Sequence, residues 1–168
     1  KGSAFGTIGE DTQLSNEQFE NNLFEAFLTC DPSKPIWLEN ESRSIGRNHI
    51  PESLWWKMRN STLYNIEVNI EIRLDRVLQY YSDNTNVDVL KESFTKIKKR
   101  LGGLDYQVAI HALECNDLRT AAAIALKYYD KSYDHQVASW GPANLRQIDG
   151  CDRVMDAANK LNEKLTSI

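Results

Sequence analysis

The sequence lacks the cysteine spacing of zinc-binding proteins and the long apolar run of membrane-spanning ones. Its three cysteines, Cys30, Cys115 and Cys151, lie far apart, no C-x-x-C pair occurs, and the histidines form no zinc-type spacing with them. No apolar stretch approaches the roughly 20 residues that a transmembrane helix needs. We therefore expect free thiols in a reducing compartment, acting as small packing residues rather than as reactive groups.

A strong excess of charge of one sign is also missing. The 168 residues are 41% hydrophobic and 26% charged, with a formal net charge of −4. This balance is ordinary for one soluble globular domain, and it provides no global positive field for nucleic acid. Only the segments 43–59 and 96–100 are locally basic. The chain begins with Lys1 rather than Met and has no signal segment, so we expect it to be part of a longer, cytosolic protein.

Neither of two common phosphate-binding motifs, G-x-x-x-x-G-K-[ST] and G-x-G-x-x-G, occurs in the sequence. The first residues include G-S-A-F-G-T-I-G, in which Gly2, Ser3 and Gly6 could still let the backbone approach a phosphate. No strand fits before this stretch, and a plain flexible loop is the favoured interpretation.

The first half of the chain alternates between helix and strand. Ser15 and Gln18 have the S-x-x-Q form of a capping box, which together with apolar residues at helical spacing predicts a helix over 16–30. Short apolar runs predict buried strands near 36–39 and 63–68. The remaining predictions are a loop over 42–50, a helix with Pro51 at its first position, and a helix capped by Asn69. Such alternation is typical of a parallel α/β layer.

From about residue 84 onward the pattern predicts helices only. Apolar residues spaced by three and four predict a helix over 87–101 that ends at Gly102, and further helices are predicted near 104–115 and 117–130. A last amphipathic helix carries Val154, Met155, Ala158, Leu161 and Leu165. The predicted fold class is an α/β fragment grading into all-α, divided into residues 1–84 and a helical domain over 85–168.

Acidic residues follow the first predicted strand. Glu39 and Glu41 would lie at its C-terminal end, where nucleotide-binding sheets place carboxylates near phosphate and magnesium. Glu39 is a candidate for holding Mg²⁺ through a water molecule. An equally good interpretation is that both residues simply begin a loop and cap a helix.

A basic segment comes next in the chain, and it contains Ser42, Arg43, Gly46, Arg47 and His49. Two arginines on a glycine-containing loop suit a multiply charged anion, because a guanidinium group binds phosphate oxygens in bidentate fashion. The alternative is an ion pair between Arg43 and the neighbouring glutamates. We favour the anion site, since nearby acidic residues do not balance the positive charge of 43–59.

Two further features have both a functional and a purely structural interpretation. Trp56 could stack on a base or a prenyl chain, but packing against another segment is favoured. The K-I-K-K-R run places Lys96, Lys98, Lys99 and Arg100 near the end of a helix, where they could bind RNA. A solvated helix face is the favoured interpretation, because the basic residues do not form one stripe and Glu92 is placed to pair with Lys96.

Taken together, several segments resemble the C-terminal half of the bacterial tRNA 2-selenouridine synthase family. The most specific block is W-L-E-N-E-S-R-S-I-G-R-N-H-I-P at 37–51. The others are K-G-S-A-F-G at 1–6, Q-F-E-N at 18–21, I-K-K-R-L-G at 97–102 and Y-Y-D-K-S-Y at 128–133. The resemblance implies a rhodanese-like domain fused to a P-loop-like domain, with the rhodanese cysteine and the P-loop lying upstream of the residues matched here. Residues 1–84 would then be the end of the P-loop-like domain, and this chain alone is expected to be inactive.

The resemblance also implies a reaction. Wobble 2-thiouridine in tRNA would be S-geranylated with geranyl diphosphate, and selenium from selenophosphate would then replace the geranylthio group. In that hypothesis Glu41 and Arg43 are the catalytic candidates, and Lys96, Lys98, Lys99 and Arg100 contact tRNA. The carry-over from the family rests on Glu39, Glu41, Ser42, Arg43 and Gly46. With the candidates from the local pattern, the anion-binding residues are Gly2, Ser3, Gly6, Ser42, Arg43, Gly46, Arg47 and His49, and Mg²⁺ is an optional cofactor near Glu39. Asn40 stands where the family pattern leads us to expect an aspartate.

Two other functions remain open at this point. The chain could be a non-catalytic RNA-binding or interaction module, or half of a P-loop kinase, which would use the same acidic and arginine residues. A P-loop and a rhodanese-type cysteine loop upstream of the matched residues would distinguish these possibilities.

Overall fold

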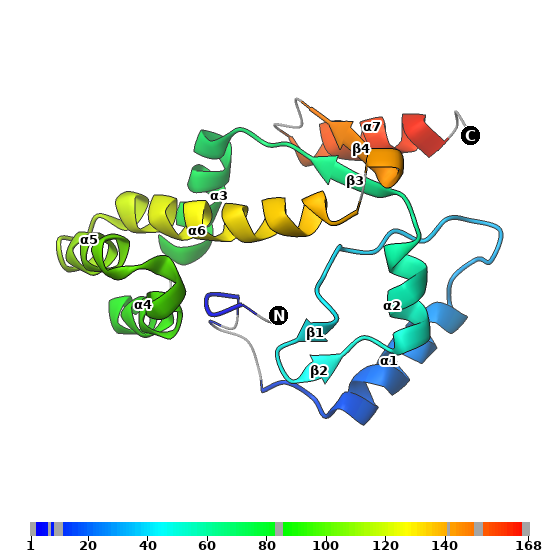
Figure 1. Ribbon diagram of the computed structural model, residues 1–168, viewed down its shortest axis with the longest axis horizontal. Coiled ribbons are helices and arrows are strands. Elements are labelled where there is room, and N and C mark those ends of the chain that lie inside the picture. The colour runs from blue at the N-terminus through cyan, green and yellow to red at the C-terminus, as the bar shows by residue number, and fades with distance from the viewer. Residues whose placement is uncertain are drawn as a thin grey trace. The chain divides into compact units, whose positions relative to one another are not determined.

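The computed structural model describes residues 3–6, 8, 12–82, 86–140, 142–149 and 153–165. The chain divides into two compact units, unit 1 (Lys1–Ser61) and unit 2 (Thr62–Ile168), and each has its own two-stranded sheet (Figure 1). Among the described helices, none combines the length and the apolar character that crossing a membrane requires.

Unit 1 consists of two helices and a short hairpin. Its elements are α1 (Asn16–Leu28), β1 (Ser44–Ile45), β2 (Asn48–His49) and α2 (Glu52–Arg59). The two strands pair antiparallel, with Ser44 opposite His49 and Ile45 opposite Asn48. Of the residues that the structure describes in this unit, only Asn48 and Ile50 are buried. Unit 1 therefore has almost no core of its own.

The helix predicted over 16–30 is confirmed as α1. Its cap is the predicted one, because the Ser15 hydroxyl accepts a hydrogen bond from the Gln18 N–H at 3.1 Å. The Gln18 carboxamide donates to the Asn22 side chain at 2.6 Å instead of reaching back to Ser15. Only one half of the capping box is formed, and that half is sufficient to begin the helix.

The strand predicted near 36–39 is wrong. This segment has no regular secondary structure, and Ile36, Trp37 and Leu38 are 46%, 44% and 45% exposed. An apolar run becomes a strand only when a neighbouring strand offers hydrogen bonds and a covered face. None of the described strands pairs with these residues. Consequently Glu39 and Glu41 do not lie at the end of a strand.

The predicted loop over 42–50 contains the β1–β2 hairpin instead. Gly46 is the first of its two turn residues and has a φ of +63°, the arrangement of a type II′ turn. The positive φ favours glycine, and a Cβ at this position would also displace the carboxamide of Gln13. Pro51, predicted as the first residue of the next helix, is the N-cap of α2.

Unit 2 is mostly helical and contains a parallel strand pair. Its elements are β3 (Leu63–Ile66), α3 (Ile70–Ser82), α4 (Val87–Leu101), α5 (Gly103–Glu114), α6 (Leu118–Ala138), η1 (Pro142–Asn144), β4 (Leu145–Ile148) and α7 (Val154–Leu165). Leu63 lies opposite Leu145 and Ile66 opposite Ile148. The strand predicted near 63–68 is thus confirmed, and the chain as described is a mixed α/β structure.

The expectation of helices alone after residue 84 is wrong, because β4 lies in that region. Its sequence Leu-Arg-Gln-Ile is short and has two polar residues at its centre, so it shows no strand pattern. It becomes a strand because β3, far earlier in the chain, supplies the ladder. For the same reason β3 and α3, which were predicted to belong with residues 1–84, lie within unit 2.

The helix boundaries of unit 2 follow predicted caps. The Asn69 side chain accepts a hydrogen bond from the Glu71 N–H at 2.9 Å at the start of α3. Gly102, with a φ of +95°, separates α4 from α5. Helix α6 is longer than predicted and reaches Ala138.

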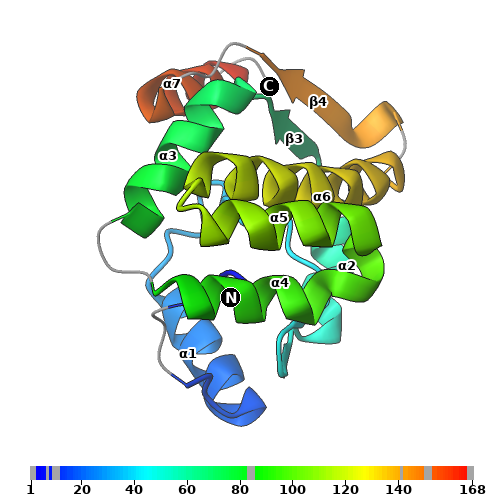
Figure 2. The same cartoon turned by 90° about the vertical axis from the view of Figure 1, so that its left-hand side faces the viewer.

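The core of unit 2 lies between consecutive helices. Helix α5 packs between α4 and α6, and α3 contacts α6 (Figure 2). Phe94 is only 1% exposed and is the largest fully buried side chain among the described residues. The other buried apolar residues of these helices are Leu74, Leu90, Ile97, Ala109, Ala112, Leu113 and Ala121. Alanines on α5 and α6 allow these helices to approach closely.

Ion pairs between side chains join α3 to α6. Arg73 binds both carboxylate oxygens of Asp130, at 3.0 and 2.6 Å. The hydrogen bonds to Asp130 raise the pKa of Arg73 above its usual range. Arg119 similarly binds Asp75 at 2.8 Å and Glu71 at 2.5 Å. The Arg73–Asp130 pair is bidentate and half-buried and so links the two helices specifically, whereas the exposed Arg119 pairs contribute little free energy.

Candidate functional site

The hairpin of unit 1 is held in shape by a residue that sequence reasoning did not select. Gln13 donates from Nε2 to the Ile45 carbonyl at 2.8 Å, and its Oε1 accepts from the Arg47 N–H at 2.9 Å. The Arg47 guanidinium donates in turn to the Gln13 carbonyl at 2.9 Å. Gln13 therefore spans the turn on both sides of Gly46. No local pattern signals this role, since the two segments are distant in sequence.

Several polar groups of the predicted anion loop are already engaged. The Ser42 hydroxyl donates to the Ser44 carbonyl at 2.6 Å, and the Ser44 hydroxyl lies 3.1 Å from His49 Nδ1. The His49 N–H donates to the Asn16 side chain at 2.6 Å. These bonds build the loop, so Ser42 and His49 shape its backbone whether or not they bind an anion.

The Arg43 guanidinium makes one ion pair with the described residues, and that pair is weak. Its guanidinium is 3.9 Å from the carboxylate of Glu52, and both side chains are more than half exposed. An exposed pair at this distance contributes little free energy. The predicted alternative partners, Glu39 and Glu41, are not the residues that pair with it. Arg43 is thus a cation that an approaching anion can bind at small cost.

The two glutamates lie in an irregular segment. The Glu41 N–H donates to the Glu39 carbonyl at 2.8 Å, Glu39 is exposed, and Glu41 is half-buried. Within the described part of the chain, no group of three or more His, Cys, Asp or Glu side chains is placed to hold a metal. A dedicated metal cage is therefore not assembled from these residues. Mg²⁺ often uses one or two carboxylates plus phosphate oxygens and water, and that weaker arrangement is what Glu39 could serve.

The glycine-rich start of the chain is only partly described. The Ser3 hydroxyl accepts a hydrogen bond from the Gly6 N–H at 2.9 Å, which closes a small turn. That donor is occupied within the turn. Gly2, the other anion-binding candidate in this stretch, lies outside the described residues.

The C-terminal half of α4 carries the second candidate surface. Lys96 pairs with Glu92 at 3.0 Å, as predicted, and Lys98 lies 4.6 Å from the centroid of the Tyr106 ring. Lys99 and Arg100 are exposed, and no described acidic side chain pairs with either. All four basic residues are exposed, and two of them, Lys96 and Lys98, also have a described partner.

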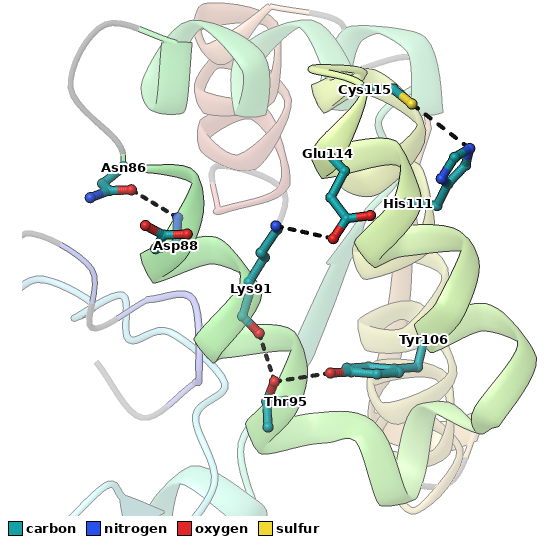
Figure 3. Close-up of polar contacts among 8 residues, drawn as sticks. All are labelled: Asn86, Asp88, Lys91, Thr95, Tyr106, His111, Glu114 and Cys115. Carbon is teal, nitrogen blue, oxygen red and sulfur yellow. Dashed lines mark hydrogen bonds and ion pairs between the residues drawn. The ribbon is translucent and has the colours of Figure 1, made fainter.

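Polar contacts between α4 and α5 position this surface (Figure 3). The Thr95 hydroxyl lies 3.2 Å from the Tyr106 hydroxyl, and it donates to the Lys91 carbonyl at 2.9 Å. Lys91 in turn binds Glu114 at 3.3 Å. Tyr106 of α5 thus contacts Lys98 of α4, a contact that was not predicted and for which the sequence offers no signal.

A histidine of α5 and the cysteine that caps this helix also lie side by side (Figure 3). His111 Nε2 lies 3.7 Å from Cys115 Sγ, and both residues are exposed. Their spacing of four residues on a predicted helix was the signal that could have identified this pair. Two ligands are too few for a structural zinc site, so the prediction that the cysteines form none is unaffected.

Comparison with known proteins gives a consistent result. Residues 1–160 match the family described as tRNA 2-selenouridine synthase AAA domain. A tRNA 2-selenouridine synthase from Shewanella denitrificans is 31% identical over 82% of this chain and 46% of its own length. The protein of the same name from Shewanella loihica is 30% identical over 82% of this chain and 45% of its own length. The chain thus spans about half the length of these relatives, and no solved structure matches it.

Proposed function

This chain belongs to the tRNA 2-selenouridine synthase family, and we propose from that membership that it forms part of an enzyme modifying tRNA. The observation that carries the proposal is the family match over residues 1–160, which includes both candidate surfaces. The proposed reaction converts wobble 2-thiouridine into 2-selenouridine, with geranyl diphosphate and selenophosphate as co-substrates. The P-loop-like character of residues 1–84 and the cytoplasmic location belong to the same proposal.

In the first proposed step, the sulfur of 2-thiouridine forms a bond to the geranyl carbon while the bond from that carbon to the diphosphate oxygen breaks. Negative charge then develops on the departing pyrophosphate, and a nearby guanidinium stabilises it. Arg43 suits this role because its guanidinium is exposed and its only described ion pair is long. Glu41 would orient the leaving group or a bridging ion, and Glu39 would hold Mg²⁺ through water.

The remaining loop residues would frame the anion. Gly46 allows the tight turn, while Gln13 holds the backbone of Arg47 beside it. A positively charged side chain on a fixed turn loses little freedom when an anion binds, which favours affinity. Ser42 and His49 would act through the loop backbone, because their side chains bond within the hairpin.

The second surface would contact tRNA. Lys99 and Arg100 are exposed cations without described acidic partners, and Lys98 is held near them by Tyr106. Phosphate contacts of this kind provide affinity without sequence specificity. The same surface favours one alternative, in which the chain is a non-catalytic RNA-binding module.

The proposed function is tested by nucleoside mass spectrometry of tRNA from a strain that lacks the gene. We expect 2-selenouridine to disappear and to return when the gene is restored. Unchanged 2-selenouridine in the deletion strain would contradict the proposal. If tRNA binding by the purified protein persisted in that case, the RNA-binding alternative would account for it.

A further inference from the structure

An exposed tryptophan of α2 lies close to the arginine of the proposed anion site. Trp56 is 58% exposed, and Glu52 precedes it by four residues in the same helix. Residues four apart share one helix face, about 6 Å apart along the axis, and helical side chains lean toward the N-terminal turn. The indole of Trp56 therefore leans toward Glu52. Because Glu52 pairs with Arg43 at 3.9 Å, Trp56 and Arg43 are neighbours on one surface of unit 1.

Exposure alone does not distinguish Trp56, since large apolar side chains of unit 2 are also exposed. What distinguishes it is an unused ring beside an available cation. The ring of Trp55 has the guanidinium of Arg59 at 5.7 Å from its centroid, and the exposed ring of Tyr80 packs edge-on against Tyr81 at 5.0 Å. Within the described residues, no aromatic ring or cation stacks on Trp56. Its ring is thus available to a ligand held by the nearby arginine.

We propose that Trp56 binds the apolar chain of a prenyl diphosphate whose charged end binds Arg43. This inference rests on the proposed function, in which the co-substrate of the first step is geranyl diphosphate. Such a molecule joins a diphosphate to an apolar chain, so it requires a cation beside an apolar surface. A chain of several carbon atoms spans the distance of about 6 Å that separates Glu52 from Trp56 along the helix. Contact between the chain and the indole removes apolar area of both from water, which selects a prenyl diphosphate over inorganic pyrophosphate.

The test measures binding of geranyl diphosphate and of inorganic pyrophosphate to the full-length protein by isothermal titration calorimetry. Trp56→Ala should weaken geranyl diphosphate binding on the order of tenfold and leave pyrophosphate binding within about twofold of wild type, because only the apolar contact is lost. Trp56→Phe keeps an apolar ring and should retain most of the affinity. The matched control is Tyr80→Ala, which removes a comparably exposed aromatic ring from unit 2 and should affect neither ligand.

Three results for Trp56→Ala would overturn the proposal. Unchanged geranyl diphosphate binding would mean that the indole does not contact the chain. Equal weakening of both ligands would mean that the variant disturbs the anion loop instead. Equal weakening of geranyl diphosphate and uridine diphosphate would identify a nucleobase as the group that Trp56 binds.

The variant Arg43→Ala separates failure of this inference from failure of the proposed function. We expect Arg43→Ala to weaken binding of both geranyl diphosphate and pyrophosphate, since both carry the anionic group. If it does so while Trp56→Ala binds both ligands as wild type does, only the role of Trp56 is contradicted. If Arg43→Ala itself binds both ligands as wild type does, the proposed anion site is contradicted, and the inference about Trp56 with it.

Discussion

The two units of this chain differ in how they bury apolar side chains. In unit 2, helix α4 packs against α5, and its residues Phe94, Leu90 and Ile97 are almost completely buried from solvent. Unit 1 instead gains its shape from polar contacts, chiefly those of Gln13 around the hairpin. Unit 2 therefore has a buried core of its own, whereas the described part of unit 1 is shaped mainly by hydrogen bonds around its hairpin.

The largest expected difference comes from removing the same side chain in each unit. Phe94→Ala should lower the free energy of unfolding by about 3–5 kcal/mol, because Phe94 is 1% exposed and its loss leaves a cavity. Phe24→Ala should change it by less than about 0.5 kcal/mol in this chain, since Phe24 is 63% exposed. Urea denaturation followed by circular dichroism measures both. Similar losses would contradict the contrast between the units.

A second prediction concerns the turn of unit 1. Gly46→Ala should destabilise the hairpin by about 1–3 kcal/mol, because the backbone has a positive φ and the new Cβ would displace the Gln13 side chain. Exchange of the Arg47 amide, which is bonded to Gln13, reports this loss. Gly103→Ala at the start of α5 is the matched control, since beyond its chain neighbours and its own helix backbone no atom lies within 4 Å of the position that its Cβ would take. An Arg47 amide equally protected in Gly46→Ala would exclude the bridging role of Gln13.

The third prediction tests the cationic surface of unit 2. Lys98→Glu/Lys99→Glu should weaken tRNA binding by the full-length protein on the order of tenfold and reduce the salt slope by about two. Lys127→Glu/Lys131→Glu makes the same change of charge on exposed positions of α6 and should have a smaller effect. Filter binding over a range of salt concentrations distinguishes them. If both variants changed tRNA affinity and the salt slope equally, the basic residues of α4 would not form a specific tRNA-binding surface.

The smallest expected effect is a pH dependence of the stability of the first turn of α6. Hydrogen bonds from the Thr120 hydroxyl and N–H lower the pKa of Asp117. Because the folded-state pKa lies below the unfolded value of about 3.9, the stabilisation is present above that value and is lost as the pH falls through the folded pKa. Asp117→Asn should abolish this acid dependence in the exchange of the Thr120 amide. An unchanged pH profile in the variant would contradict the assignment.

Local sequence features predicted much of the helical structure. Two helix starts have predicted caps, because the side chains of Ser15 and Asn69 accept hydrogen bonds from backbone N–H groups. One helix end is set by Gly102, which adopts a positive φ. These effects depend only on neighbouring residues. The strands were harder to predict. Ile36–Leu38 have a strand composition without a partner, while Leu145–Ile148 have a partner without the composition. Strand formation depends on a distant neighbour, which a local pattern does not contain.

The candidate site shows the same limit. Arg43 and Lys99 could be selected as candidate anion-binding residues from charge and spacing alone. Each lies in a locally basic segment, where few acidic side chains are close enough to pair with it. Gln13 and Tyr106 could not, since each acts through a contact that the fold creates. The helical spacing of His111 and Cys115 would have been enough to predict their contact.

The proposed role of Arg43 in anion binding is the central claim, and geranylation of tRNA by the full-length protein tests it most directly. Arg43→Ala is compared with Lys57→Ala, which removes an exposed positive charge from the same basic segment. We predict that Arg43→Ala loses at least about a hundredfold in rate, as expected when a group that stabilises developing charge is removed, and that Lys57→Ala stays within about twofold of wild type. A rate for Arg43→Ala close to that of wild type would contradict the proposed role.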